Sequence, residues 1–178
     1  MYVSEISTVA PDAFKTELQK RVYQMLDTLN IEYSRVDTAE VVTMEDCRLV
    51  NEKLSMDMVK TLFVCNSKKD TFYLVVTSGS KTFNSKAFAA AVGSTRVSFA
   101  PSELLEQMLG VTIGAATIFS KLLIDSAPVQ VVIDSEIAGS QWYGCSDGTT
   151  TGYMKLAVAD VLQKFLPHVG HRPLIVEL

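Results

Sequence analysis

The sequence predicts an α+β domain in which helices surround a mixed, largely antiparallel, curved sheet. Two runs rich in β-branched and aromatic residues, 59–66 and 70–77, flank a short segment of turn composition and predict a β-hairpin. Helical and strand patterns are interspersed without a regular βαβ order, which disfavours an all-parallel sheet. The 178 residues are 48% hydrophobic and 20% charged, enough for one domain with a buried core. We therefore expect residues 1–178 to form a single domain.

The first half of the chain is predicted to fold as helix, strand, helix and hairpin, over residues 12–30, 31–36, 44–54 and 59–77. Pro11 suits the first position of the first helix, and Asn30 suits its end. Thr43 with Asp46 resembles an N-terminal cap for the second helix.

The second half is predicted to contain helices over residues 85–92, 101–109 and 157–166, and strands over residues 95–99, 117–124, 129–133, 153–156 and 174–176. Pro101 and Gly110 mark the two ends of the middle helix. The hydroxyl-rich segment 142–153 is predicted to be a loop. It is interpreted as a binding loop held by a rigid scaffold, and a well-bonded surface turn is the alternative.

Composition and charge exclude several classes of protein. A formal net charge of −4 argues against sequence-blind binding to nucleic acid, so a nucleic-acid contact would need a local basic patch. The three cysteines show no C-x-x-C spacing, which predicts reduced thiols without a disulfide framework or a structural zinc site. The sequence shows no export signal and no apolar run near the ~18 residues of a membrane span. A cytoplasmic protein without membrane contact is predicted.

Motif searches predict neither a cofactor nor a metal. Neither type of glycine-rich phosphate loop occurs. His168 and His171 have the H-x-x-H spacing, but Pro167 and Gly170 interrupt the helix that such a metal site would need. Lys60 stands out as a charged residue at the start of an apolar hairpin. Its amine either points to solvent or lines a pocket that holds an anionic or carbonyl group.

Five segments, in order from about Phe14 onward, carry a resemblance to a known family. They read V-K-T-L-F-V with the following F-Y-L-V-V-T-S-G-S-K; V-T-I-G-A-A-T-I-F; V-Q-V-V-I-D-S-E-I; W-Y-G-C-S-D-G-T-T-T-G-Y-M-K-L; and V-L-Q-K-F-L-P-H-V-G-H-R-P. The ordered set resembles the YbaK and prolyl-tRNA-synthetase-associated domain family. In particular it looks like the free-standing prolyl-tRNA editing proteins, which hydrolyse alanine mischarged onto proline tRNA.

The resemblance implies site residues and also shows departures from the family pattern. Lys60 matches the active-site lysine, and Thr61 stands where an asparagine is common. The segment 114–118 matches a glycine-led loop that closes over the aminoacyl group, with Ile118 in place of a proline. In the segment that often reads G-C-H-P-x-x-N-T, this chain has Ser146, Asp147 and Thr150 in place of the histidine, proline and asparagine.

The implied activity is a trans-acting deacylase for a small amino acid, alanine, on proline tRNA, with the tRNA acceptor end as partner and an aminoacyl-tRNA synthetase as a further one. DNA is not expected. The implied catalytic residues are Lys60 and Ser146. The implied substrate-binding residues are Thr61, Gly114, Ala115, Ala116, Thr117, Asp147 and Thr150, and the implied nucleic-acid contact is Lys81, with Lys86 and the 68–69 turn as companions.

Each residue has an expected role and the function has alternatives. Lys60 would hold the terminal ribose-phosphate or the ester carbonyl, and backbone N–H groups of 114–117 would cradle the aminoacyl group. Ser146, Asp147 and Thr150 would position water or bond the ribose hydroxyls. The alternatives are a binding module without hydrolysis, a deacylase for a different small amino acid or free ester, and a partner-binding subunit.

Overall fold

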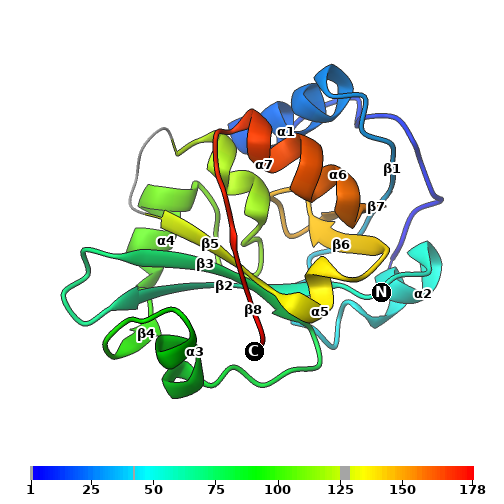
Figure 1. Cartoon of the computed structure of the whole chain (residues 1–178). Coiled ribbons are helices and arrows are strands. Elements are labelled where there is room, and N and C mark those ends of the chain that lie inside the picture. Colours follow the sequence, from blue (N-terminus) through cyan, green and yellow to red (C-terminus); the bar gives the residue numbers. More distant parts are fainter. Residues whose placement is uncertain (1, 42, 125–128) are drawn as a thin grey trace.

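Two sheets form the centre of the computed structural model, which describes residues 2–41, 43–124 and 129–178 (Figure 1). The smaller sheet has the order β1 (Tyr33–Asp37), β7 (Gly152–Ala157), β6 (Trp142–Ser146) and is antiparallel throughout. The larger sheet has the order β4 (Val97–Phe99), β2 (Val59–Asn66), β3 (Phe72–Ser78), β5 (Val129–Asp134), β8 (Leu174–Val176).

The larger sheet mixes both strand directions. β2 is antiparallel to β3 and β4, whereas β5 is parallel to β3 and β8. The predicted α+β class with a mixed, largely antiparallel sheet and surrounding helices is confirmed. The strands divide between two sheets, however, because β6 pairs with β7 and not with the hairpin of the larger sheet.

Helices cover both faces of the larger sheet (Figure 1). Their bounds are α1 (Glu17–Thr28), α2 (Arg48–Leu54), α3 (Ser85–Ala91), α4 (Ser102–Leu109), the 3₁₀ helix η1 (Ile118–Leu122), α5 (Ser135–Ala138), α6 (Val158–Asp160), the π-helical turn η2 (Val161–Phe165) and α7 (Leu166–His168). No helix within the described ranges has the length and apolar character that crossing a bilayer requires.

The first two helices begin later than predicted, and a side-chain cap sets the start of the first. The Thr16 hydroxyl accepts a hydrogen bond from the Gln19 N–H at 3.0 Å, so α1 begins at Glu17 and not after Pro11. The predicted Thr43–Asp46 pair does form: the Thr43 N–H and hydroxyl both donate to the Asp46 carboxylate. It closes a turn that precedes α2 instead of capping the helix itself.

Two further predictions are wrong. Residues 117–124 contain the 3₁₀ helix η1 and no strand, since Thr117 caps a helical turn and the apolar Ile118 and Phe119 are both fully buried. A short apolar run does not distinguish a buried helix from a buried strand. Residues 142–153 form the β6–β7 hairpin with a short turn, and not a long loop.

The alternation of β2 divides the core between its two faces. Odd-numbered residues such as Phe63 join the main core with α1, η1, the smaller sheet and the helical segment 158–166. Even-numbered residues such as Val64 join a second core against α3, whose Phe88 is fully buried. Successive side chains of a strand point to opposite faces, so Lys60 belongs to the α3 face and Thr61 to the main-core face.

Candidate active site at the open edge of β2

The outer edge of β2 lacks a partner strand over part of its length. β4 pairs only with Val64–Asn66, and the Ala100 N–H extends the contact to the Phe63 carbonyl. At the other end a single parallel bridge joins Met58 to Gly144 of β6. Among the described residues no strand pairs with the edge between these contacts. A cavity of about 450 Å³ lies there.

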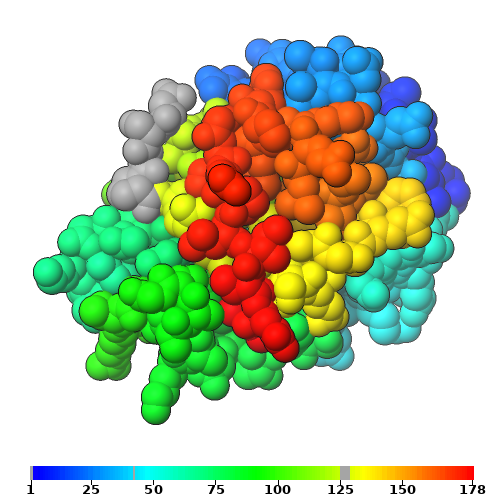
Figure 2. Space-filling model, in the orientation of Figure 1, coloured from blue at the N-terminus to red at the C-terminus, as the bar shows by residue number. Residues whose placement is uncertain are grey.

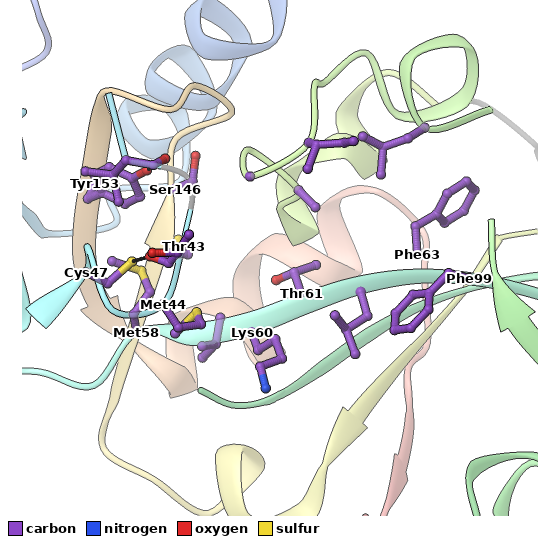
Figure 3. Close-up of a pocket in the computed structure, with 18 of the residues that line it drawn as sticks. Thr43, Met44, Cys47, Met58, Lys60, Thr61, Phe63, Phe99, Ser146 and Tyr153 are labelled. Atoms are coloured by element: carbon purple, nitrogen blue, oxygen red, sulfur yellow. Dashed lines mark hydrogen bonds between the residues drawn. The ribbon is translucent and has the colours of Figure 1, made fainter. Parts of the chain in front are cut away.

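The cavity wraps around this bare edge and has two differently lined ends. One end is lined by sulfur-containing, aliphatic and hydroxyl side chains: Val41, Thr43, Met44, Cys47, Met58, Cys145, Ser146 and Tyr153. The other is lined by aromatic and aliphatic side chains and one serine: Phe63, Phe99, Ala100, Ser102, Leu105 and Ile113. Lys60, Thr61, Leu62, Gly114 and Ala116 line the middle, and Lys60 is the one charged residue in the described lining (Figure 3).

Lys60 and Thr61 point to opposite sides of β2 (Figure 3). The Lys60 ammonium donates to the backbone carbonyl of Lys81 at 2.5 Å. Both residues line the cavity, which for Lys60 is one of the two placements that the sequence left open. A ligand that contacts both must pass around the strand edge, because the strand itself separates the two side chains.

Lys81 is neutralised by carboxylates. Its ammonium lies 2.7 Å from the Asp134 carboxylate and 2.9 Å from that of Glu136, and it also donates to the Leu178 carbonyl. The hydrogen bonds to Asp134 and Glu136 raise the pKa of Lys81. Burial opposes ionisation of Asp134, but hydrogen bonds from Lys81 and Thr77 outweigh it and lower the pKa of this carboxyl. The predicted contact of Lys81 with tRNA is therefore disfavoured by its geometry.

Ser146 lines the cavity, but its hydroxyl is engaged in the β6–β7 turn. It donates to the Thr149 carbonyl at 2.6 Å and accepts from the Gly148 N–H at 3.0 Å. A hydroxyl has one proton to donate and two lone pairs. One acceptor site therefore remains, and the proton is already held by a carbonyl.

Asp147 and Thr150 lie outside the described lining of the cavity. Asp147 is fully buried against α1, where it accepts hydrogen bonds from the Gln19 amide at 2.8 Å and the Tyr23 hydroxyl at 3.1 Å. Burial, with the Asp147 charge second, raises the pKa of Tyr23. The Thr150 carbonyl accepts from the Val41 N–H. These contacts hold the β6–β7 turn in place, so Asp147 and Thr150 stabilise the fold and do not line the site.

The predicted glycine-led loop is divided between the cavity and the core. Gly114 has a φ of +88°, a conformation that L side chains rarely adopt, and it lines the cavity together with Ala116. Ala115 is buried in the main core, and its N–H donates to the Thr112 carbonyl. Thr117 is buried as the cap of η1. The structure therefore brings together Lys60, Thr61, Gly114, Ala116 and Ser146, and leaves the other predicted residues apart.

The sequence reasoning missed most of the apolar lining. Cys145 could have been found from its place next to Ser146, and Phe63 from its shared face with Thr61. Met44 and Cys47 carried no such signal. Burial raises the pKa of Cys47 to about 11, with nearby Asp46 adding to it, and burial also raises the pKa of Cys145. Both thiols are thus protonated near neutral pH and line the cavity as apolar groups.

No three His, Cys, Asp or Glu side chains within the described ranges converge as metal ligands. His171, one of the two histidines weighed above, instead accepts a hydrogen bond from the Val131 N–H at 3.0 Å through Nε2. It joins the segment after α7 to β5.

The fold and the sequence together define the class of this protein. Residues 38–164 match the model of the aminoacyl-tRNA editing domain family. The chain belongs to this family, the YbaK and prolyl-tRNA-synthetase-associated group of editing deacylases that act in translation fidelity.

Individual relatives agree with this assignment. The chain is 28% identical to the prolyl-tRNA editing protein ProX of Acetoanaerobium sticklandii, over 91% of this chain and 98% of the relative. It is 28% identical to prolyl-tRNA synthetase associated domain-containing protein 1 of Danio rerio, over 96% of this chain and 90% of the relative. A crystal structure described as that of a proposed trans-editing enzyme for prolyl-tRNA synthetase superposes with a TM-score of 0.63 at 16% identity, covering 93% of this chain and 99% of that one, and shares the fold.

Proposed function

We propose that this protein is a trans-acting deacylase that removes a small amino acid, alanine, from mischarged proline tRNA. The proposal depends chiefly on the cleft at the bare edge of β2, which has one lysine and no carboxylate in its described lining. A cleft of this charge suits the polyanionic end of a tRNA even in a protein of net charge −4. Residues 1–178 would act as one editing domain, and a tRNA substrate would place it in the cytoplasm.

The reaction needs little acid–base machinery because an aminoacyl-tRNA ester is already activated. The oxygen of a water molecule attacks the ester carbonyl carbon, the bond from that carbon to the ribose oxygen breaks, and the ribose oxygen takes up a proton. Placing ester and water together and stabilising the developing negative charge can supply much of the acceleration. Lys60 would contribute its ammonium to the ribose-phosphate or to the carbonyl oxygen.

The main-core side of the cleft would hold the aminoacyl group. Thr61 and the Gly114 turn line this side together with Ser146. The free acceptor site of the Ser146 hydroxyl can bind a water or the substrate ammonium. It is a poor nucleophile, because its proton already binds the Thr149 carbonyl and the described lining of the cleft contains no carboxylate or histidine to remove it. Ser146 would thus position groups and not attack.

Selectivity would come from the volume of the sulfur-lined end. Met44, Met58 and Cys145 line this end of the cleft together with Ser146. One methylene changes binding by roughly 1–3 kcal/mol in a hydrophobic pocket, so a second, size-based check after aminoacylation is useful for small amino acids. A panel of tRNAs charged with glycine, alanine, serine or cysteine would show which residue is removed. Preference for a larger residue would contradict the assignment to alanine.

The first test is deacylation of alanyl-tRNA(Pro) by the native chain and by Lys60→Ala. If the ammonium stabilises developing charge, the loss should be about 100-fold or more in kcat/KM, as for removal of one oxyanion donor. Lys20→Ala, which removes an exposed lysine on α1 outside the described cleft lining, is the matched control and should keep the native rate. Equal rates for Lys60→Ala and the native chain would remove Lys60 from the mechanism.

A second candidate function is an aminoacyl-tRNA-binding module without turnover. It is favoured by the engaged Ser146 hydroxyl at the position where the family often has a histidine. Saturable binding of alanyl-tRNA(Pro), with a deacylation rate equal to that without protein, would select this function. A stable complex with a synthetase that survives Lys60→Ala would add a partner to either function.

A further inference from the structure

Phe99 is a solvent-facing aromatic ring at the end of the cleft opposite Ser146. It is the last residue of β4, it lines the cavity, and it is 62% exposed. In the β2–β4 register Phe99 lies directly opposite Val64, so its side chain shares the face of the sheet with Leu62 and Lys60. Figure 3 shows Phe99 and Lys60 on one side of β2 and Thr61 on the other.

Packing from behind holds this ring in place. The ring centroids of Phe99 and Phe83 are 5.6 Å apart, and those of Phe83 and Phe88 are 5.5 Å apart. Phe88 is fully buried in the second core. The three rings thus connect an exposed aromatic surface to the interior. Large exposed apolar groups beside a cleft commonly mark a binding site.

The chemistry of this side of the cleft fits the end of a nucleic acid. Aromatic rings stack with any nucleobase, and a nearby cation binds the sugar-phosphate. Phe99 supplies the ring, Lys60 supplies the ammonium, and Leu62 lies between them on the strand. The described lining of the cleft contains no carboxylate that would repel a phosphate.

We infer that Phe99, with Leu62 at its edge, stacks the terminal adenine of the tRNA on the α3 side of β2. The aminoacyl ester then passes around the bare strand edge to the Thr61 side. This inference rests on the proposed function, because it assumes an aminoacyl-tRNA substrate. It assigns the two faces of one strand to two parts of that substrate, the nucleotide to one and the amino acid to the other.

The kinetic test compares Phe99→Ala with the native chain on alanyl-tRNA(Pro). Loss of one stacked base is worth ~1–3 kcal/mol, so KM should rise about 5- to 140-fold at 1.4 kcal/mol per tenfold, with kcat changed less. Phe99→Tyr should keep the native KM. Trp142→Ala removes another exposed aromatic ring, one that is not part of the described cleft lining, and should have no effect. A native KM in Phe99→Ala would overturn the inference.

A binding test separates this inference from the proposed function. Trp142 is the single tryptophan, so Phe99→Trp combined with Trp142→Phe places one fluorophore at the stacking surface. An RNA oligonucleotide that ends in C-C-A and carries no amino acid should quench its fluorescence saturably. The same oligonucleotide with an abasic last position should not. Equal quenching by both would overturn the stacking role. Quenching that requires the terminal base, together with no deacylation by the native chain, would support the stacking role and exclude the hydrolase function.

Discussion

The two hairpins that border the cleft have turns of similar composition and opposite surroundings. The β2–β3 turn is exposed, and Asn66 donates to Asp70 in solvent contact. The β6–β7 turn is buried against α1, where the Asp147 carboxylate accepts hydrogen bonds from Gln19 and Tyr23. Turn-forming residues thus predict that the chain reverses but not whether the turn faces water. In the second hairpin, polar residues that look like a binding loop stabilise the fold.

The largest expected effect is on stability, from Asp147→Ala. The change leaves the buried Gln19 and Tyr23 groups without their acceptor, and unsatisfied buried groups cost about 1–3 kcal/mol each. We expect the free energy of unfolding in urea to fall by about 3 kcal/mol or more. Asp70→Ala in the exposed turn is the control and should change it little. Equal effects of the two substitutions would abolish the distinction between the turns.

The next effect is expected at Lys81, in the turn that follows the first hairpin. Lys81→Met leaves the buried Asp134 without its cation and loosens the carbonyl that holds the Lys60 ammonium. A displacement of Lys60 by about 1 Å can lower deacylation by up to about 100-fold. Lys81→Arg should retain much of the activity. If Lys81 instead binds tRNA directly, both substitutions should raise KM without changing the pH dependence of stability.

That pH dependence has a defined sign. The pKa of Asp134 in the folded protein lies below its ordinary value of 3.8. Its contribution to the free energy of unfolding is therefore complete at neutral pH and is lost as the pH falls below about 4. In Lys81→Met the burial of Asp134 is no longer opposed by the cation, so mild acid should stabilise the variant relative to the native chain. Urea unfolding at pH 7 and pH 4 measures the difference.

The smallest effect is expected for the two thiols, Cys47 and Cys145, at the sulfur-lined end of the cleft. Because burial raises the pKa of Cys47 to about 11, its alkylation by iodoacetamide at pH 7.5 should be slow and should accelerate only near pH 10 or above. Cys145→Ala should leave kcat within about twofold, because a protonated thiol does not attack an ester. Mass spectrometry of alkylated peptides measures the first expectation. Rapid alkylation at neutral pH would show an activated thiol.

Local signals were enough for the elements whose ends are set by nearby residues. The β2–β3 hairpin, the helix ended by Gly93 and the helix ended by Gly110 all occur where the sequence predicted them. Strand β6 was missed because glycine, cysteine and serine in W-Y-G-C-S have little strand character alone, and its pairing with β7 supplies the reason for its conformation.

The candidate site was predictable only in part. Lys60 was found because a charged residue on an apolar strand is conspicuous in the sequence, whereas Thr61 and Gly114 were expected only through the resemblance to the family. The structural position of Asp147 depends on Gln19 and Tyr23, more than one hundred residues away, and no local pattern could show it. The gap beside β2 is likewise a property of strand order, which follows from packing of the whole chain.

The single bridge between Met58 and Gly144 gives the two sheets one narrow point of contact at the cleft. A Cβ atom at position 144 would lie 2.6 Å from the Met56 sulfur and 2.8 Å from the Asp57 carbonyl oxygen. Any larger residue there requires a shift of segment 56–57 or of β6. Glycine at this position therefore keeps segment 56–57 and β6 close together. Because the neighbouring Met58 and Cys145 line the cleft, a substitution at position 144 can change the width of the cleft without contacting the amino acid.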